Sequence, residues 1–216
     1  MQDPATPHYF SATPTTASSP SSVPLVLPDL SLTLASDRGV FSGSRIDPGT
    51  KYLLLDGPPL PTGPVDLLDL GCGYGPIALA LALRAPEARV WAVDVNDRAV
   101  ALCRANAASA DVADRVHAVR PDEVPDDVRF TAIWSNPPIR IGKPALHALL
   151  GDWLARLLPG GDAVLVVQKH LGADSLTRWL TEAGWPTRRL SSRAGYRLLG
   201  VSASPEPPDI GPEGAR

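Results

Sequence analysis

The chain has 216 residues, which suits one domain with flanking segments, because domains usually hold ~100–200 residues. Hydrophobic residues make up 44% and charged residues 20%, which excludes a wholly disordered chain, a coiled coil, collagen and a disulfide scaffold. The formal net charge of −3 is unevenly distributed, with −7 on residues 1–128 and +6 on residues 129–200. The basic part favours a polyanionic partner, although ordinary surface charge explains it equally well.

The sequence indicates no secretory signal and no membrane span. Two cysteines in a chain of this length are typical of a reducing compartment. The N-terminal residues contain no basic segment followed by an apolar one, and apolar stretches such as 77–83 are far shorter than the ~20 residues of a membrane helix. We therefore expect a soluble, cytoplasmic protein.

Both ends of the chain differ in composition from the middle. Residues 1–22 are rich in Ser, Thr, Ala and Pro and predict a flexible arm, in which the aromatic cluster 8–10 could dock onto the body. Residues 203–216 predict a disordered tail. The sequence contains 24 prolines, and much of this excess lies in these ends. One domain is expected over 23–202.

The first part of that domain, residues 23–64, predicts a hairpin and a cover. Residues 25–34 alternate in polarity in their second half and are interrupted by Pro28-Asp29, which predicts a β-hairpin. A short helical pattern follows at 51–55, and four prolines and two glycines make 57–64 a stiff connector.

From residue 65 onward, predicted strands alternate with predicted helices. Repeated βαβ units predict an α/β domain with a mostly parallel sheet, and the short last connection predicts an antiparallel edge hairpin at the C-terminus. Asp97 is expected to cap its helix, and Pro159-Gly160-Gly161 to end another. The predicted strands are 65–70, 89–93, 116–119, 130–134, 163–168, 187–192 and 196–202, and the helices are 75–84, 97–108, 144–157 and 173–183.

Two motifs follow the first two predicted strands of this core. Asp69-Leu70-Gly71-Cys72-Gly73-Tyr74-Gly75 ends a strand and opens a helix, where glycines permit a sharp turn and a close approach of a ligand. Such a turn needs glycine even without a ligand. Asp94 ends the second strand about 20 residues later, which suits an acceptor for ribose hydroxyls. Together the two motifs favour a ligand that contains ribose.

A third motif, Ser135-Asn136-Pro137-Pro138-Ile139, follows the fourth core strand. The side-chain oxygen of Asn136 and the carbonyl of Pro137 can accept the two hydrogens of a planar amine, and the prolines restrict the backbone that presents them. An amine held in this way can attack an electrophilic methyl group. Neither His nor Glu stands in the motif as a base, and none is needed, because the alkylated nitrogen is acidic.

These motifs resemble those of class I S-adenosylmethionine-dependent methyltransferases, and Asn-Pro-Pro is typical of the branch that methylates amino groups. The segments 39–42, 47–50 and 135–143 narrow the resemblance to the methyltransferase small domain family, over residues 8–202. That family includes enzymes that methylate guanine N2 in small-subunit ribosomal RNA. The resemblance implies a Rossmann-like seven-stranded sheet, S-adenosylmethionine as cofactor, and ribosomal RNA or the 30S subunit as partner.

The resemblance also implies roles for individual residues. The expected cofactor-binding residues are Asp69, Gly71, Cys72, Gly73, Tyr74, Gly75, Asp94, Val95, Asp122 (an acceptor for the adenine amine) and Asn136, with Phe41 and Thr50 covering the pocket. The expected catalytic residues are Asn136, Pro137, Pro138 and Ile139, and the expected RNA contacts are Arg140, Lys143 and Lys169.

The sequence departs from its relatives in two ways and leaves alternatives open. Many relatives have an aromatic residue where Ile139 stands, and aliphatic Ile139 offers no π stacking to a base. Some relatives have an additional N-terminal domain, so RNA capture would fall to this domain, its arm or a partner. Adenine N6, a protein glutamine or a small-molecule amine are alternative substrates, and a non-catalytic binding domain is the third interpretation.

Neither cysteines nor histidines predict a further chemical role. Cys72 and Cys103 are expected to be packed in the interior rather than to act as nucleophiles. The four histidines show no metal-ligand spacing, so no metal is expected. A monomer or weak dimer is expected.

Overall fold

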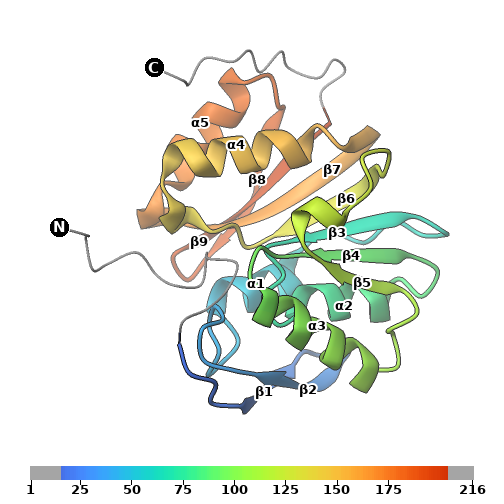
Figure 1. The fold of residues 1–216 in the computed structure, drawn as a ribbon. Coiled ribbons are helices and arrows are strands. Elements are labelled where there is room, and N and C mark those ends of the chain that lie inside the picture. Colours follow the sequence, from blue (N-terminus) through green and yellow to red (C-terminus); the bar gives the residue numbers. More distant parts are fainter. Residues whose placement is uncertain (1–15, 204–216) are drawn as a thin grey trace.

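The structure is a computed structural model that describes residues 16–203. The aromatic cluster 8–10 and nearly all of the predicted tail lie outside the described residues. A seven-stranded sheet in the order β5-β4-β3-β6-β7-β9-β8 forms the centre of the molecule (Figure 1), and a separate hairpin pairs β1 with β2. The strands are β1 Ser21–Val26, β2 Ser31–Ser36, β3 Asp66–Leu70, β4 Arg89–Val93, β5 Val116–Val119, β6 Phe130–Ser135, β7 Leu157–Gln168, β8 Thr187–Arg193 and β9 Tyr196–Ser202.

The sheet direction confirms the predicted fold class. Strands β3 to β7 pair in parallel, whereas β9 pairs antiparallel to both β7 and β8. The α/β pattern, the C-terminal edge hairpin and the N-terminal hairpin are therefore confirmed. The helices are α1 Pro48–Asp56, α2 Pro76–Arg84, α3 Asp97–Ser109, α4 Lys143–Leu154 and α5 Ala173–Glu182, with short 3₁₀ turns η2 Pro121–Glu123, η3 Ile139–Ile141 and η4 Lys169–Leu171.

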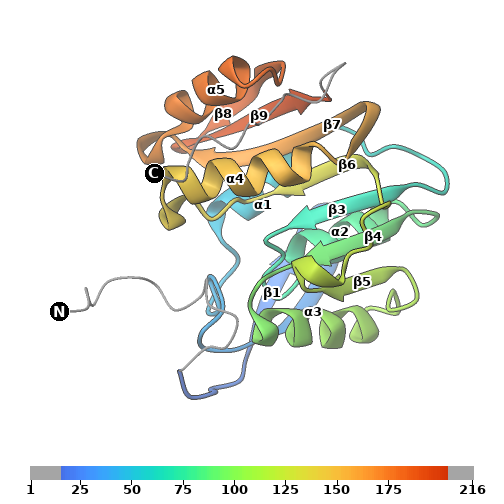
Figure 2. The same cartoon turned by 45° about the horizontal axis from the view of Figure 1, so that its top comes forward.

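Helices cover both faces of the sheet. Figures 1 and 2 show α4 and α5 on one side and α2 and α3 on the other. The apolar side chains of α1, α2, α3 and the hairpin form one buried cluster with one face of the sheet, and those of α4 and α5 form a second cluster with the other face. This arrangement explains why most positions of the central strands are apolar, because both faces are removed from water.

The N-terminal hairpin is attached to the core through a buried asparagine. The side chain of Asn106 on α3 accepts from the backbone N–H of Ala35 (2.7 Å) and donates to the carbonyls of Ala35 (2.9 Å) and Tyr74 (2.8 Å). Burying an amide is favourable only when its hydrogen bonds are made. Asn106 thus connects the hairpin, α3 and the glycine-rich turn before α2.

The hairpin begins earlier than its polarity pattern predicts. Strand β1 starts at Ser21, within the predicted arm 1–22, and the preceding Ser18 and Ser19 donate to the carboxylate of Asp37. These hydrogen bonds lower the pKa of Asp37 against the effect of desolvation. The described end of the predicted arm is therefore attached to the hairpin.

Two local predictions are wrong. Asn96, not Asp97, caps α3, because its Oδ1 accepts from the N–H of Arg98 (3.0 Å) and Ala99 (3.4 Å). Pro159-Gly160-Gly161 does not end a helix: α4 stops at Leu154, and these residues lie within the long, irregular β7. In the first case two adjacent residues can fill the same local role, and in the second the pairing of β7 with β6 places these residues in a strand.

Candidate active site

A cavity of about 380 Å³ opens at the carboxyl ends of the parallel strands. It lies where the chain reverses its direction across the sheet, with β4 on one side of β3 and β6 on the other. Ligands of open α/β sheets bind at such switch points. The hydroxyl of Ser135 at the end of β6 donates to the carbonyl of Leu70 at the end of β3 (2.6 Å), which holds the two strand ends together.

The glycine-rich turn after β3 presents bare backbone to this cavity. Gly71, Gly73 and Gly75 all have positive φ angles, of 77°, 54° and 98°. A Cβ atom on Gly71 or Gly73 would meet nothing within 4 Å, whereas one on Gly75 would lie 2.7 Å from Sγ of Cys103. Gly71 and Gly73 thus leave room on the cavity side, and Gly75 is required for packing of α2 against α3.

The side chain of Asp94 stabilises the same turn. One carboxylate oxygen accepts from the N–H of Gly73 (2.9 Å) and the other from the N–H of Asn96 (2.9 Å). Burial raises the pKa of Asp94, and these hydrogen bonds oppose that effect. Each carboxylate oxygen has a second lone pair, so Asp94 can still accept hydrogen bonds from a ligand in the cavity.

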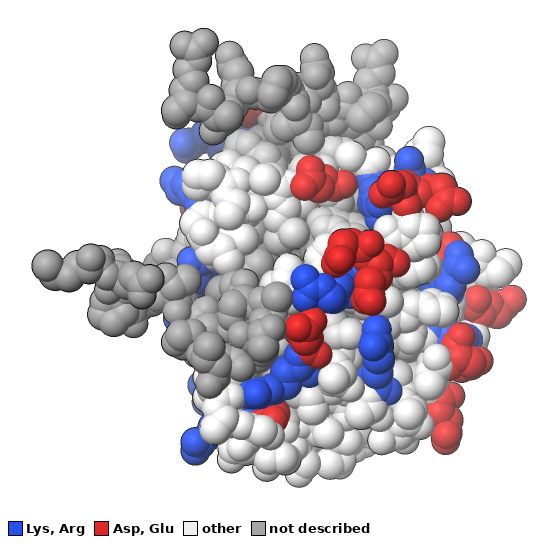
Figure 3. Space-filling model, in the orientation of Figure 1, with Lys and Arg blue, Asp and Glu red and all other residues white. Residues whose placement is uncertain are grey.

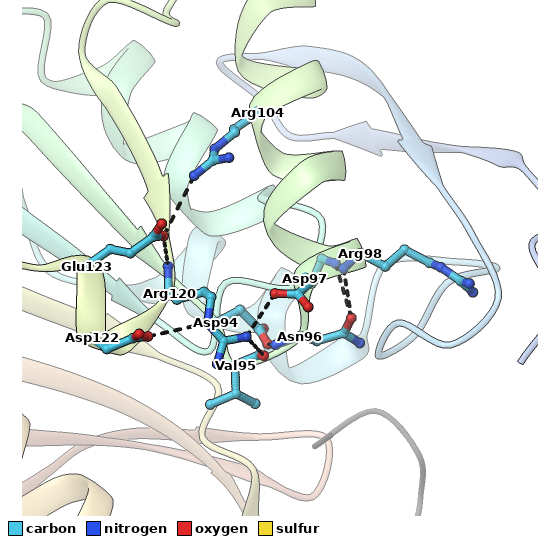
Figure 4. A network of polar contacts seen from close by, with 10 residues as sticks. Asp94, Val95, Asn96, Asp97, Arg98, Arg104, Arg120, Asp122 and Glu123 are labelled. Carbon is cyan, nitrogen blue, oxygen red and sulfur yellow. Dashed lines mark hydrogen bonds and ion pairs between the residues drawn. The ribbon is translucent and has the colours of Figure 1, made fainter. Parts of the chain in front are cut away.

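A network of ion pairs surrounds the outer side of the Asp94 loop (Figure 4). Arg120 donates to Asp97 (2.8 Å) and Asp122 (3.3 Å), and to the carbonyl of Val95 (3.1 Å). The network explains what Asp97 does instead of capping α3: it holds the loop after β4 against η2. Asp122 is exposed and does not line the cavity, whereas its neighbour Pro121 does.

Asn136, the first residue after β6, has a fixed side-chain orientation. Its Nδ2 group donates to Oδ1 of Asp47 (2.8 Å) and to Oγ1 of Thr50 (3.0 Å). Both amide hydrogens are used, so the amide oxygen is the group left to accept a hydrogen bond. Asn136 and Asp47 both line the cavity.

The two prolines after Asn136 form a tight turn. The N–H of Ile139 donates to the carbonyl of Pro137 (2.8 Å), and Pro138 between them has φ −76° and ψ 71°, the values of an inverse γ-turn. A carbonyl oxygen has two lone pairs, so Pro137 can accept a second hydrogen bond. The prolines thus shape a rigid wall of the cavity, as their fixed φ angles predict.

The remaining cavity walls are mainly apolar and come from residues that sequence reasoning did not select. Leu149 and Leu171 line the cavity together with Ile139, and Leu171 is 41% exposed at its rim. Gln168 at the end of β7 and its sheet partner Tyr196 also line it. No local motif marks these residues, and the pairing of β7 with β9 brings Gln168 and Tyr196 together at the site.

The structure brings together some of the predicted site residues and separates others. The glycine turn, the Asp94 loop and the Asn-Pro-Pro motif meet at one cavity, although Cys72, Tyr74 and Gly75 do not line it. The cavity is lined by Phe41, Gly71, Gly73, Asp94, Val95, Asn136, Pro137, Pro138, Ile139 and Arg140. Those outside its lining are Asp69, Cys72, Tyr74, Gly75, Thr50, Asp122, Lys143 and Lys169, although Thr50, Cys72 and Tyr74 line a small adjoining cavity.

Positive charge without an acidic partner gathers near the Asn-Pro-Pro motif. In the described part of the chain, Arg140, Lys143 and Lys169 form no ion pair, and all three are exposed after β6 or β7. By contrast, Arg193 pairs with Asp56 and Arg197 with Asp174.

The surface over α3 and β5 has a different charge pattern. There acidic and basic side chains alternate (Figure 3).

Asp69 is a buried carboxyl behind the glycine turn. Its Oδ2 accepts from the N–H of Ala78 at the start of α2 (2.9 Å), and its Oδ1 has no hydrogen-bond partner among the described residues. Burial raises the pKa of Asp69 to about 8, with a further contribution from the charge of Asp94. Asp69 is thus mostly protonated at neutral pH. Its hydrogen bond to Ala78 connects the end of β3 to the start of α2, on either side of the glycine-rich turn.

The raised pKa of Asp69 predicts that stability decreases as the pH rises from about 4 to about 8. The unfolded chain releases this proton near 3.8, whereas the folded chain keeps it to about 8. The folded state therefore binds more protons in this interval, and the free energy of unfolding falls by at most ~1.4 kcal/mol per pH unit. Urea unfolding across this range should show the decrease, and Asp69→Asn should flatten it, leaving the part due to the raised pKa of Asp94. An equal slope in Asp69→Asn would contradict the assignment.

Within residues 16–203, no three or more His, Cys, Asp or Glu side chains are grouped so that they could hold a metal ion. In the same residues, no helix has the length and apolar character that crossing a membrane requires.

The geometry agrees with the result of a comparison against protein families. A family described as "Methyltransferase small domain" matches residues 31–199, which include the glycine turn, Asp94 and the Asn-Pro-Pro motif. The chain belongs to the methyltransferase small domain family. The expected family is confirmed, and by family and fold the chain is a methyltransferase.

Curated relatives of this chain include one protein of similar length and several longer ribosomal RNA methyltransferases. The uncharacterized protein YbxB of Bacillus subtilis is 34% identical over 195 residues, which cover 89% of this chain and 96% of YbxB. Ribosomal RNA small subunit methyltransferase C of Pseudomonas aeruginosa is 34% identical over 185 residues, or 83% of this chain and 54% of that protein. The methyltransferase thus spans about half the length of the ribosomal RNA methyltransferases that it matches.

A solved structure of the same kind supports the fold and the expected cofactor. The Thermus thermophilus 16S rRNA N2 G1207 methyltransferase, in complex with AdoMet and guanosine, superposes with a TM-score of 0.71 at 25% identity. The match covers 85% of this chain and 50% of that one. The Rossmann-like methyltransferase fold is therefore confirmed, and the expected dependence on S-adenosylmethionine agrees with this neighbour.

Proposed function

We propose that this chain is an S-adenosylmethionine-dependent N-methyltransferase that methylates the N2 amine of a guanine in small-subunit ribosomal RNA. The observation that supports it most directly is the Asn136 amide, whose two hydrogens are used by Asp47 and Thr50 while its oxygen remains available. A hydrogen-bond acceptor at this place suits a substrate that donates from an amine. The related ribosomal RNA methyltransferases support the choice of RNA.

The residues of the cavity fit the proposed cofactor. Gly71 and Gly73 leave their backbone open, as the close approach of a ligand requires, and Asp94 has lone pairs to accept ribose hydroxyls. Val95 and Pro121 line the cavity with apolar surface that can contact an adenine ring. When bound, S-adenosylmethionine supplies an electrophilic methyl group on its sulfonium centre.

The contribution of the chain to the reaction is to hold the amine. Oδ1 of Asn136 and the free lone pair of the Pro137 carbonyl would accept the two amine hydrogens, which turns the nitrogen lone pair toward the methyl group. Orientation of this kind lowers the barrier by removing the entropy cost of bringing the two groups together. The nitrogen becomes acidic on alkylation, so its proton can leave to water without a dedicated base.

The apolar walls would hold the base that bears this amine. Ile139, Leu149 and Leu171 can pack against the face of a purine that is flipped or single-stranded. Phe41 and Tyr196 line the same cavity and offer the aromatic surface that Ile139 lacks. In the proposed site, aromatic rings for stacking on the base would thus come from Phe41 and Tyr196, because Ile139 follows the Asn-Pro-Pro motif in this chain.

The unpaired cations near the motif would contact the RNA backbone. Arg140 lines the cavity, and Lys143 and Lys169 follow the ends of β6 and β7. Arg and Lys neutralise phosphates and give affinity without reading sequence. A ribosomal substrate would place the protein in the cytoplasm.

The experiment that tests the function identifies the methylated product. The purified chain is incubated with tritium-labelled S-adenosylmethionine and, separately, 30S subunits, naked 16S RNA or a protein extract, and the RNA is digested to nucleosides. Label in N2-methylguanosine supports the proposal. Label in N6-methyladenosine, or only in protein or small molecules, would show another amine as substrate, and no label above an Asn136→Ala control in any fraction would contradict catalysis.

A further inference from the structure

Two residues from the start of α1 hold the amide of Asn136, and neither contacts the amine in the proposed mechanism. Asp47 and Thr50 accept its two hydrogens at 2.8 Å and 3.0 Å, although they stand 89 and 86 residues earlier in the chain. Thr50 is only 5% exposed. The contact is therefore a tertiary one, made in a part-buried position next to the cavity.

This contact distinguishes the two possible orientations of the amide. If the carboxamide were rotated by 180°, its oxygen would face a carboxylate oxygen of Asp47, and two acceptors would repel each other. Its NH₂ group would then face the cavity as a donor, and it could not accept a hydrogen bond from an amine. The negative charge of Asp47 thus selects the orientation in which Oδ1 of Asn136 is available.

The same oxygen of Asp47 has a second role in local structure. Oδ1 accepts from the N–H groups of Gly49 (2.8 Å) and Thr50 (3.1 Å), which caps α1. A Cβ atom on Gly49 would lie 2.8 Å from a ring carbon of Tyr196 and 2.9 Å from Oδ1 of Asp47. The cap, the cavity-lining tyrosine and the amide of Asn136 are therefore packed around one carboxylate.

We propose that Asp47, assisted by Thr50, is a positioning residue that fixes the Asn136 amide for amine recognition. The inference rests on the proposed function in one respect, namely that the hydrogen bond accepted by Oδ1 of Asn136 comes from an amine. Asp47 itself acts through Asn136 and helix α1. The sequence motif Asp47-Pro48-Gly49-Thr50 then has two purposes: it starts a helix, and it orients a side chain that directly follows the distant strand β6.

Variants can separate the capping role from the positioning role. Asp47→Ser keeps a capping oxygen for α1 but shortens the side chain by one atom, so it no longer reaches Nδ2 of Asn136. We expect turnover to fall about 10–100-fold with the affinity for S-adenosylmethionine unchanged. Thr50→Val removes the second acceptor at nearly constant volume, and Thr50→Ser, which keeps a hydroxyl, should lose less turnover than Thr50→Val. Equal losses in these two variants would contradict the role of the hydroxyl.

A double-mutant cycle tests whether Asp47 acts through Asn136. In an Asn136→Ala background, Asp47→Ser should cause little further loss of turnover, because the side chain that Asp47 positions is absent. A purely structural role would produce the same fold-loss in both backgrounds. That additive result would overturn the proposal.

A spectroscopic readout tests the proposal without any methyl acceptor. The side-chain NH₂ signals of Asn136, assigned by their absence in Asn136→Ala, should exchange slowly in the wild type and move toward the positions of free amides in Asp47→Ser. Unchanged signals in Asp47→Ser would overturn the inference even for an active enzyme. Failure to find N2-methylguanosine would instead count against the proposed function and leave this readout intact.

Discussion

Asn136→Ala is expected to lower the rate of methyl transfer about 10²–10³-fold while cofactor affinity stays within a few-fold of the wild type. The change removes the acceptor that orients the amine, and losing one such oriented hydrogen bond at a reacting centre has effects of this size. Single-turnover transfer from S-adenosylmethionine to the identified substrate measures the rate, and calorimetric titration measures cofactor binding.

The structure also supplies a control for this variant. Asn106 is a buried asparagine whose hydrogen bonds hold the hairpin and do not reach the cavity. Asn106→Ala should lower the unfolding temperature more than it changes the rate of transfer by the folded protein. Turnover of Asn136→Ala at the wild-type rate, with cofactor bound, would exclude Asn136 from amine recognition.

Asp94→Ala is expected to weaken binding of S-adenosylmethionine about 100-fold. Hydrogen bonds to a charged acceptor each contribute ~1.5–3 kcal/mol, and the variant loses the acceptor for the ribose hydroxyls. It also leaves the N–H groups of Gly73 and Asn96 without their present partner, so the glycine turn becomes less ordered. Calorimetric titration measures the loss, and turnover should recover in part at high cofactor concentration.

Asp122→Asn is the matched control for Asp94→Ala. Asp122 was expected from family resemblance to accept from the adenine amine, but it is exposed, bonds Arg120 and does not line the cavity. We expect less than a threefold change in cofactor affinity. A loss as large as that of Asp94→Ala would restore Asp122 to the site, and unchanged affinity in Asp94→Ala would remove Asp94 from it.

The sequence alone was sufficient for features that depend on short stretches of chain. Alternating strands and helices predicted the seven-stranded sheet, because apolar runs between glycine and proline residues have few other stable arrangements. The glycine turn, Asp94 and Asn136 were found for a related reason: each follows a strand, and parallel strands deliver their carboxyl ends to one edge. That the three meet at one cavity follows from the order β4-β3-β6.

Two predictions, the N-cap of α3 and the role of Pro159-Gly160-Gly161, were wrong because local sequence allows more than one structure. Asn96 and Asp97 are adjacent residues that can both cap a helix, and the ion pair of Asp97 with Arg120 accompanies the choice of Asn96. Pro159-Gly160-Gly161 is a common helix end, yet it lies in β7 because pairing with β6 resumes after an irregularity. Propensities within a few residues do not contain the energy of contacts made from a distance.

The fold class, the family and the three strand-end motifs could be predicted from the sequence, because they depend on residue type and spacing along the chain. The direction of the Asn136 amide could not, since Asp47 and Thr50 reach it from 89 and 86 residues away. The same holds for the finding that Leu149, Gln168 and Tyr196 line the cavity and that Asp122 does not. Hydrogen-bond direction and the walls of a cavity depend on which distant segments pack together, and spacing along the chain does not specify this.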